Sequence, residues 1–206
     1  MIAVVDYGVG NLFSLTASLK MVGADSEVTS DPERTLAADK IILPGVGAFG
    51  DAAARLSALH LDDVLRTAAS RGTPLMGICL GMQLLFEKSY EFGEHKGLGL
   101  LKGAITPMQG RVPAELKIPQ IGWNSLHKTK ESRILSRIEE GDFVYFVHSF
   151  SAEGCEDSLA AVTDYGATIT AAVEKDHVCG CQFHPEKSGK VGLEILRAFC
   201  FGGNET

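Results

Sequence analysis

Residues 74–86 read PLMGICLGMQLLF, an apolar run that contains a cysteine between two glycines. The residues before Cys79 predict a short buried strand, and those from Leu80 to Phe86 predict the start of a helix. Cys79 would then occupy a sharp strand-to-helix turn, where Gly77 and Gly81 leave room for strained backbone. The turn also places the sulfur at a helix N-terminus, whose free N–H groups and dipole favour a thiolate. The stretch therefore predicts a nucleophile elbow.

The segment HPE at residues 184–186 supplies possible partners for this cysteine. A cysteine nucleophile needs a base, and the base needs a group that orients it. If the segment is extended, His184 and Glu186 point to one side, so the imidazole can meet the sulfur while the carboxylate holds the other ring nitrogen. A lone buried cysteine is usually an inert small hydrophobe. The elbow together with the later His-x-Glu favours a catalytic triad of Cys79, His184 and Glu186.

Composition excludes several classes of protein. The 206 residues most simply form one domain, 1–206, with a sizeable core. A net charge of −7 and a pI near 5.4 argue against nucleic acid or an anionic membrane as partner. Five cysteines without a CxxC spacing predict no disulfide framework, no metal site and a reducing cytoplasm, and no cofactor is expected. We see no basic leader, and the longest apolar stretch is too short to cross a bilayer.

Apolar strands and amphipathic helices alternate through residues 1–88, which indicates βαβ units and a parallel sheet. Beyond Lys88 the chain is richer in glycine, proline and short extended segments, some of which should pair antiparallel. Gly122-Trp123-Asn124 falls in a loop-like stretch. We expect strands at 1–5, 26–29, 40–43, 74–78, 143–147, 159–163, 168–173 and 178–182, and helices at 12–21, 52–59, 64–69 and 191–199.

Acyl transfer also needs hydrogen-bond donors for a tetrahedral oxyanion. The elbow itself offers the N–H of Leu80. The loop Gly45-Val46-Gly47, which follows a buried strand, is the best source of a second donor, because glycine lets backbone approach or turn where a side chain would clash. An ordinary strand–helix connection is the alternative. His148 can line the site or serve the structure, and Trp123 can be a core anchor or an interface contact.

These motifs resemble those of a known family. GICLGMQ at 77–83 and QFHPEKSG at 182–189 are similar to the class I (triad) glutamine amidotransferases. DYGVGN at 6–11, PGVGAF at 44–49 and GWN at 122–124 narrow the resemblance to the glutaminase subunits of imidazole glycerol phosphate synthase, in histidine biosynthesis. The matches run from residue 2 to the closing helix.

The resemblance implies a flavodoxin-like α/β fold, with a central, mostly parallel sheet flanked by helices and additional antiparallel strands in the C-terminal half. It implies that Cys79 attacks the side-chain amide of glutamine and forms a thioester. His184 would move the protons, and Glu186 would orient His184. The residues implied as substrate contacts are Gly47, Gln83, Ser149 and Phe150, and those implied at a subunit interface are Asn11, Trp123 and Lys187.

The resemblance also implies a heterodimer with a TIM-barrel cyclase that accepts the ammonia. Ammonia in water near neutrality is mostly ammonium, which is not a nucleophile, so the product should travel along a shielded path. In this family the loop that matches residues 44–47 is inactive until the partner binds its ligand. Gln120 departs from the family, which commonly has histidine there, and we expect the change to affect one interface contact.

Three other functions are compatible with the same sequence features. The same glutaminase chemistry can serve a different synthase, such as one that amidates a sugar. A free-standing cysteine hydrolase of γ-glutamyl compounds needs the same triad. An inactive binding module is the last alternative, and the presence of Cys79, His184 and Glu186 argues against it.

Overall fold

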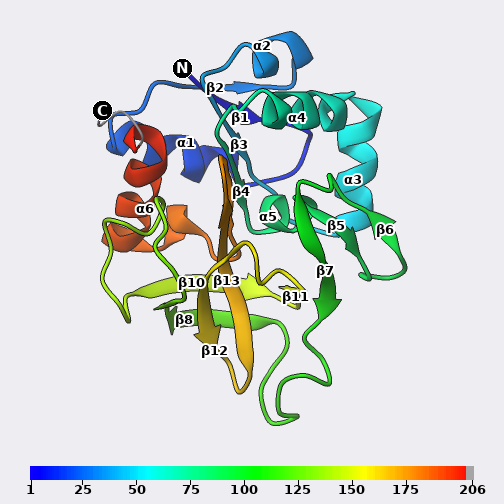
Figure 1. Ribbon diagram of the computed structural model, residues 1–206, viewed down its shortest axis with the longest axis vertical. Coiled ribbons are helices and arrows are strands. Elements are labelled where there is room, and N and C mark those ends of the chain that lie inside the picture. Colours follow the sequence, from blue (N-terminus) through cyan, green and yellow to red (C-terminus); the bar gives the residue numbers. More distant parts are fainter. Residues whose placement is uncertain (203–206) are drawn as a thin grey trace.

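The computed structural model, which describes residues 1–202, is built on an eight-stranded sheet (Figure 1). The strand order is β2-β1-β3-β4-β14-β13-β12-β9; neighbours from β2 to β14 pair parallel and the rest antiparallel. The parallel sheet and the additional antiparallel strands agree with the expected class. The strands are β1 (Ile2–Val5), β2 (Ser26–Thr29), β3 (Lys40–Leu43), β4 (Leu75–Ile78), β9 (His127–Lys128), β12 (Leu159–Asp164), β13 (Thr168–Lys175) and β14 (Val178–Cys181).

Helices cover both faces of the parallel part, which explains why its central strands are apolar throughout. In β1, Ile2 and Val4 pack on one face with α1 (Leu12–Met21) and α6 (Gly189–Phe201). Ala3 and Val5 point to the other face, where α3 (Phe49–Ala58) and α4 (Leu61–Ser70) lie (Figure 1). Successive side chains alternate because the strand is pleated. No helix within residues 1–202 is both long enough and apolar enough to cross a membrane.

Two smaller sheets lie beside the main one and correct one expectation. Trp123 is not in a loop: it belongs to β8 and pairs with Tyr145 of β10 in an antiparallel ladder. Gly122, at φ +138°, and polar neighbours hide this strand from a search for apolar alternation. The strands are β8 (Gln120–Ser125) and β10 (Phe143–His148) in one sheet, and β11 (Phe150–Glu153), β7 (Leu101–Pro107), β5 (Phe86–Ser89) and β6 (His95–Lys96) in the other.

Two helices also differ from expectation. The helix after Cys79, α5 (Leu80–Leu84), has only five residues, and Phe86 already belongs to β5. Pairing of β5 with β7 overrides the local apolar pattern. A short helix, α2 (Pro32–Leu36), occupies a segment expected to be loop, because Asp31 caps it by accepting from the N–H of Glu33 at 2.8 Å.

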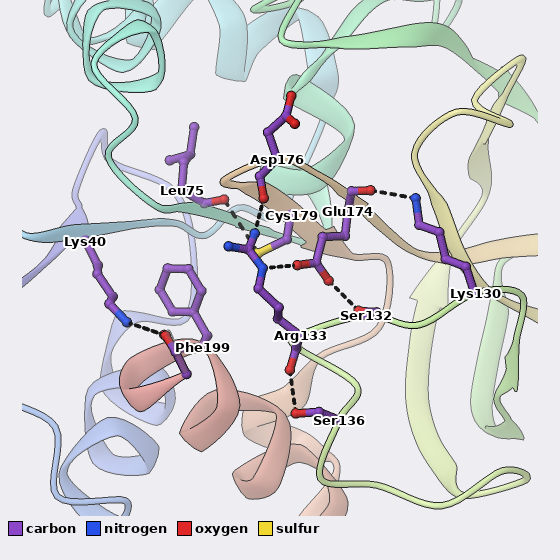
Figure 2. A network of polar contacts seen from close by, with 11 residues as sticks. Lys40, Leu75, Lys130, Ser132, Arg133, Ser136, Glu174, Asp176, Cys179 and Phe199 are labelled. Carbon is purple, nitrogen blue, oxygen red and sulfur yellow. Dashed lines mark hydrogen bonds and ion pairs between the residues drawn. The ribbon is translucent and has the colours of Figure 1, made fainter. Parts of the chain in front are cut away.

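A polar network ties the segment between β9 and β10 to β13 (Figure 2). The Glu174 carboxylate accepts from Arg133 Nε and from Ser132 Oγ, each at 2.5 Å. Lys130 donates from Nζ to the carbonyl of Glu174 at 2.8 Å. Each oxygen of this buried carboxylate has a protein partner, so the network fastens a long connection to the sheet.

Candidate active site

The cysteine lies where the sequence places it, between the end of β4 and the start of α5. Cys79 has φ +54° and ψ −112°, a strained conformation that surrounding structure must hold. Its N–H donates to the carbonyl of Cys181 at 2.8 Å. A Cβ on Gly77 would lie 2.6 Å from the oxygen of Gly81, and a Cβ on Gly81 would lie 1.8 Å from the oxygen of Leu43. Both glycines are therefore required by close packing, and the turn has the geometry of an elbow.

His184 and Glu186 meet, but by a different route from the one expected. His184 Nδ1 and Glu186 Oε1 are 2.8 Å apart, and both side chains are buried. The segment is not extended: Pro185 begins a 3₁₀ turn, η1 (Pro185–Lys187), that brings the carboxylate back to the ring. The other ring nitrogen, His184 Nε2, is buried and has no hydrogen-bond partner among the described residues. That nitrogen is therefore available to the sulfur, which lines the same cavity.

Two histidines of this cavity have opposite pKa shifts. Burial lowers the pKa of His184, but its interactions with the nearby Cys79 sulfur and the Glu186 carboxylate outweigh burial and raise the pKa to about 9. Burial lowers the pKa of His148 to about 4, and its bond to the Phe150 carbonyl offsets only part of the effect. His184 is thus the histidine whose surroundings favour holding a proton near neutrality.

A cavity of about 350 Å³ contains most of the expected site residues. Gly45 and Glu186 are exceptions, since neither lines the cavity. A Cβ on Gly45 would be 2.5 Å from Tyr7 Oη, and Glu186 is paired with His184. A larger open hollow of about 1040 Å³ lies over residues 128–136, away from Cys79, and several of its charged side chains belong to the network of Figure 2. The expected residues that line the smaller cavity are Val46, Gly47, Cys79, Leu80, Gln83, Ser149, Phe150 and His184.

The loop beside the cysteine is anchored at one end and open at the other. Tyr7 Oη donates to the Pro44 carbonyl at 2.8 Å, and burial raises the pKa of Tyr7, so the phenol stays protonated. Gly47 has φ +101° and nothing within 4 Å of the position of a Cβ. Leu80 is the first residue of α5, so its N–H has no partner within the helix. Two possible sources of oxyanion donors, the loop at Gly47 and the N–H of Leu80, therefore lie at the wall of the cavity.

Glu91 lines the cavity although no sequence motif predicts it there. It follows β5, and its Oε2 accepts from the N–H of Phe49 at 2.7 Å. A single glutamate in a polar segment carries no local signal of this position. Within residues 1–202 no group of three or more histidine, cysteine, aspartate or glutamate side chains is arranged to hold a metal ion.

The three expected interface residues have different surroundings. Trp123 is half exposed and packs edge-on against the ring of Tyr145, at 6.0 Å between centroids. Lys187 Nζ lies 5.8 Å from the centre of the same ring. Asn11 instead caps α1, because its Oδ1 accepts from the N–H of Ser14 at 3.2 Å. Gln120, which was expected to affect one interface contact, is fully buried and so cannot itself touch a partner.

A cysteine elbow beside a buried His–Glu pair defines the class of enzymes that transfer acyl groups through a thiolate. The family model described as glutamine amidotransferase class-I matches residues 3–202. A protein of Wolinella succinogenes named imidazole glycerol phosphate synthase subunit HisH is 49% identical over 202 residues, covering 97% of this chain and 98% of its own length. The chain therefore belongs to the class I glutamine amidotransferases, in the family of the HisH subunits.

Two further comparisons agree with this assignment. The protein of the same name from Aquifex aeolicus is 50% identical over 198 residues, covering 95% of this chain and 94% of its own length. A crystal structure described as a glutamine amidotransferase superposes with a TM-score of 0.74 at 18% identity, covering 97% of this chain and 99% of its own. At that identity the second likeness shows the fold, which is that of the class I amidotransferases.

Proposed function

We propose that this chain is the glutaminase subunit of an imidazole glycerol phosphate synthase. It hydrolyses L-glutamine to glutamate and ammonia, and it passes the ammonia to a cyclase subunit in histidine biosynthesis. The observation that carries the proposal is that Cys79 and His184 line one cavity, while His184 Nδ1 is paired with the buried Glu186 carboxylate. Curated relatives named as HisH subunits, which match nearly the whole chain, support the choice of synthase.

The reaction starts when the Cys79 thiol gives its proton to His184 Nε2, the nitrogen without a protein partner. The thiolate then attacks the side-chain carbonyl carbon of glutamine. The C–N bond breaks as His184 returns the proton to the leaving nitrogen, which releases ammonia and leaves a γ-glutamyl thioester. Neutral His184 next takes a proton from an attacking water, and the sulfur leaves as glutamate is released. Glu186 holds the ring and stabilises its cation throughout.

The cavity offers groups for both ends of the substrate. The Leu80 N–H and the loop Gly45-Val46-Gly47 are the source of the oxyanion donors, with Gly47 and Leu80 at the cavity wall. Gly47, Gln83, Ser149 and Phe150 contact the glutamine. Among the described lining residues Glu91 is the carboxylate, and a carboxylate suits the α-ammonium group.

The partner is a TIM-barrel cyclase that forms a heterodimer with this chain through Asn11, Trp123 and Lys187. The β8–β10 sheet supports this placement, since it exposes large apolar side chains, and such patches mark interaction surfaces. They are Ile121, Trp123 and Phe143, which are 60%, 52% and 57% exposed. We also infer that residues 1–206 form one amidotransferase domain. A cytoplasmic location stays a prediction.

We further propose that the partner's ligand switches on the oxyanion loop. Gly47 has a left-handed φ and nothing within 4 Å of the position of a Cβ, and glycine tolerates the change in φ that a turning peptide requires. One missing oxyanion donor costs roughly 10²–10³ in rate. The isolated chain should therefore hydrolyse glutamine at least that much more slowly than the liganded complex. A fully active isolated chain would exclude this gating.

The division of labour is tested with the Cys79→Ala variant in complex with the candidate cyclase. Glutamine-dependent synthesis should disappear, while synthesis from added ammonium salt should continue, because the partner consumes the ammonia. Assembly is checked by gel filtration. If the assembled variant also failed with ammonium salt, or still used glutamine at the wild-type rate, the proposed function would be wrong.

A further inference from the structure

Gln182 is a buried side chain next to the nucleophile that the reaction above leaves without a role. It lies between β14 and His184, it is fully buried, and its N–H donates to the carbonyl of Ala171 at 2.8 Å. Its Nε2 is 3.8 Å from Cys79 Sγ, and its Oε1 is 3.0 Å from Gln83 Nε2. A buried amide in such a place must have its polar atoms paired to be tolerated.

The hydrogen bonds determine which end of the Gln182 amide faces the sulfur. Gln83 Nε2 lies 3.2 Å from the Phe150 carbonyl, and a carbonyl can only accept, so the NH₂ group of Gln83 must be on that side. The same NH₂ group faces Gln182, which must therefore present its oxygen to Gln83. The NH₂ group of Gln182 is then the end that points at Cys79.

The Phe150 carbonyl is itself held in place. It accepts a second hydrogen bond from His148 Nδ1 at 2.8 Å. His148 is buried, and its other ring nitrogen, Nε2, lies 3.1 Å from the side-chain amide of Gln120. Because this carbonyl accepts from two donors, it fixes one end of a series of hydrogen bonds that runs from Phe150 through Gln83 and Gln182 to Cys79. The orientation of the Gln182 amide thus follows from the backbone of β11.

We propose that Gln182 is a positioning residue, whose Nε2–H donates to the Cys79 thiolate and keeps the sulfur aimed at the substrate carbon. The proposal deepens the proposed function, since it rests on Cys79 being the nucleophile. A donor is worth more to a charged acceptor than to a neutral one, so the contact favours thiolate over thiol. The other titratable groups near this sulfur are His184, His148, Tyr7, Cys181 and Glu91.

Two substitutions separate this role from simple support of Gln83. Gln182→Met keeps the volume but removes both polar ends. Gln182→Glu keeps an oxygen that can accept from Gln83, but it replaces the donor at the sulfur with a second acceptor. If Gln182 only supports Gln83, the glutamate variant should behave like wild type. If it supports the thiolate, both variants should be impaired.

The variants are measured in the complex with the cyclase and its ligand, as kcat and KM for glutamine. In parallel, the rate at which iodoacetamide alkylates Cys79 is followed by peptide mapping from pH 6 to pH 9. We expect both variants to lose about 10- to 100-fold in kcat, the range for a hydrogen bond to a charged group. KM should change little. The midpoint of the alkylation profile should move to higher pH.

A matched control is Thr170→Val, which removes a buried hydrogen bond to the carbonyl of Ala152, away from the sulfur. Its alkylation profile and kcat should match those of wild type. A wild-type kcat and profile in Gln182→Glu would overturn the positioning role, as would a change confined to KM. The Cys79→Ala variant distinguishes failure of the proposed glutaminase function from failure of the positioning role of Gln182. If it retains activity the proposed function fails, whereas loss there with normal Gln182 variants overturns only this inference.

Discussion

Two buried glutamates show how this fold treats structural and reactive groups differently. Glu174 on β13 and Glu186 in η1 have side chains that are 8% and 4% exposed. Both oxygens of Glu174 accept a hydrogen bond from a side chain, one from Arg133 and the other from Ser132 (Figure 2). Glu186 has only one partner, His184, and its Oε2 is buried without a partner among the described residues.

The difference indicates what each site is built for. An unpaired buried polar atom costs about 1–3 kcal/mol, so a site that served only stability would pair it. The Glu174 network does so and joins distant segments of the chain. The Glu186 site leaves both Glu186 Oε2 and His184 Nε2 unpaired, and a free Nε2 suits a base that must exchange protons with the thiol and the substrate. Substitutions should therefore separate activity from stability.

The largest effect is expected at the reactive site. His184→Ala should lower glutaminase turnover by several orders of magnitude, because triad residues act as a unit. Glu186→Gln should do less harm, since the carboxylate orients the base but does not transfer the proton. Turnover of the liganded complex and thermal melting of the chain are measured for both. Equal or reversed losses would mean that the base or its orienter is wrongly assigned.

The pH dependence of turnover tests the role of His184 at the reactive site. The pKa of His184 is raised to about 9, so below that pH the Cys79–His184 pair holds the one proton that the leaving nitrogen needs. As pH rises through about 9 the pair loses this proton, and turnover should fall about tenfold per pH unit. A stopped assay from pH 7 to pH 10.5 checks this. A profile that stays flat to pH 10.5 would contradict the assigned role of His184.

At the structural site the expected loss is in stability. Arg133→Met leaves the Glu174 carboxylate without its cation, which should cost about 1–2 kcal/mol, discounted because the arginine is half exposed. The melting temperature should fall by a few degrees. Turnover at 25 °C should stay near the wild-type rate, because Arg133 does not line the cavity of Cys79. A large loss of turnover without unfolding would erase the distinction between the two sites.

A smaller loss should follow from Ser132→Ala, which removes one hydrogen bond from the same carboxylate. We expect about 0.5–1.5 kcal/mol, measured by urea unfolding. Ser136→Ala is the matched control, because that hydroxyl donates only to the carbonyl of Arg133 at 2.8 Å on the surface. The control should be closer to wild type. Equal effects of the two serine variants would mean that Ser132 does not serve Glu174.

The parts of the site that could be predicted are the ones encoded locally. The elbow is predicted by three residues within a stretch of five, Gly77, Cys79 and Gly81, since a strained turn needs small neighbours. His184 and Glu186 are adjacent in sequence, so their contact was predictable even though η1, rather than an extended segment, makes it.

What could not be predicted depends on contacts between distant segments. Gln182 meets Gln83 across 99 residues, and its amide is oriented by a carbonyl of a third segment. Glu91 enters the cavity because β5 pairs with β7, and nothing near it in sequence signals this. The strand that contains Trp123 could not be predicted, because its pairing with β10, and not its own composition, makes β8 a strand.

The measurement that tests the central claim most directly is detection of the thioester. The liganded complex is mixed with glutamine, quenched in acid, digested and analysed by mass spectrometry. We expect a γ-glutamyl adduct on the peptide that contains Cys79. It should be absent in Cys79→Ala and absent from the peptides of Cys155, Cys179, Cys181 and Cys200, which are buried and do not line the cavity. Wild-type turnover by Cys79→Ala, or an adduct on another cysteine, would contradict the assignment of the nucleophile.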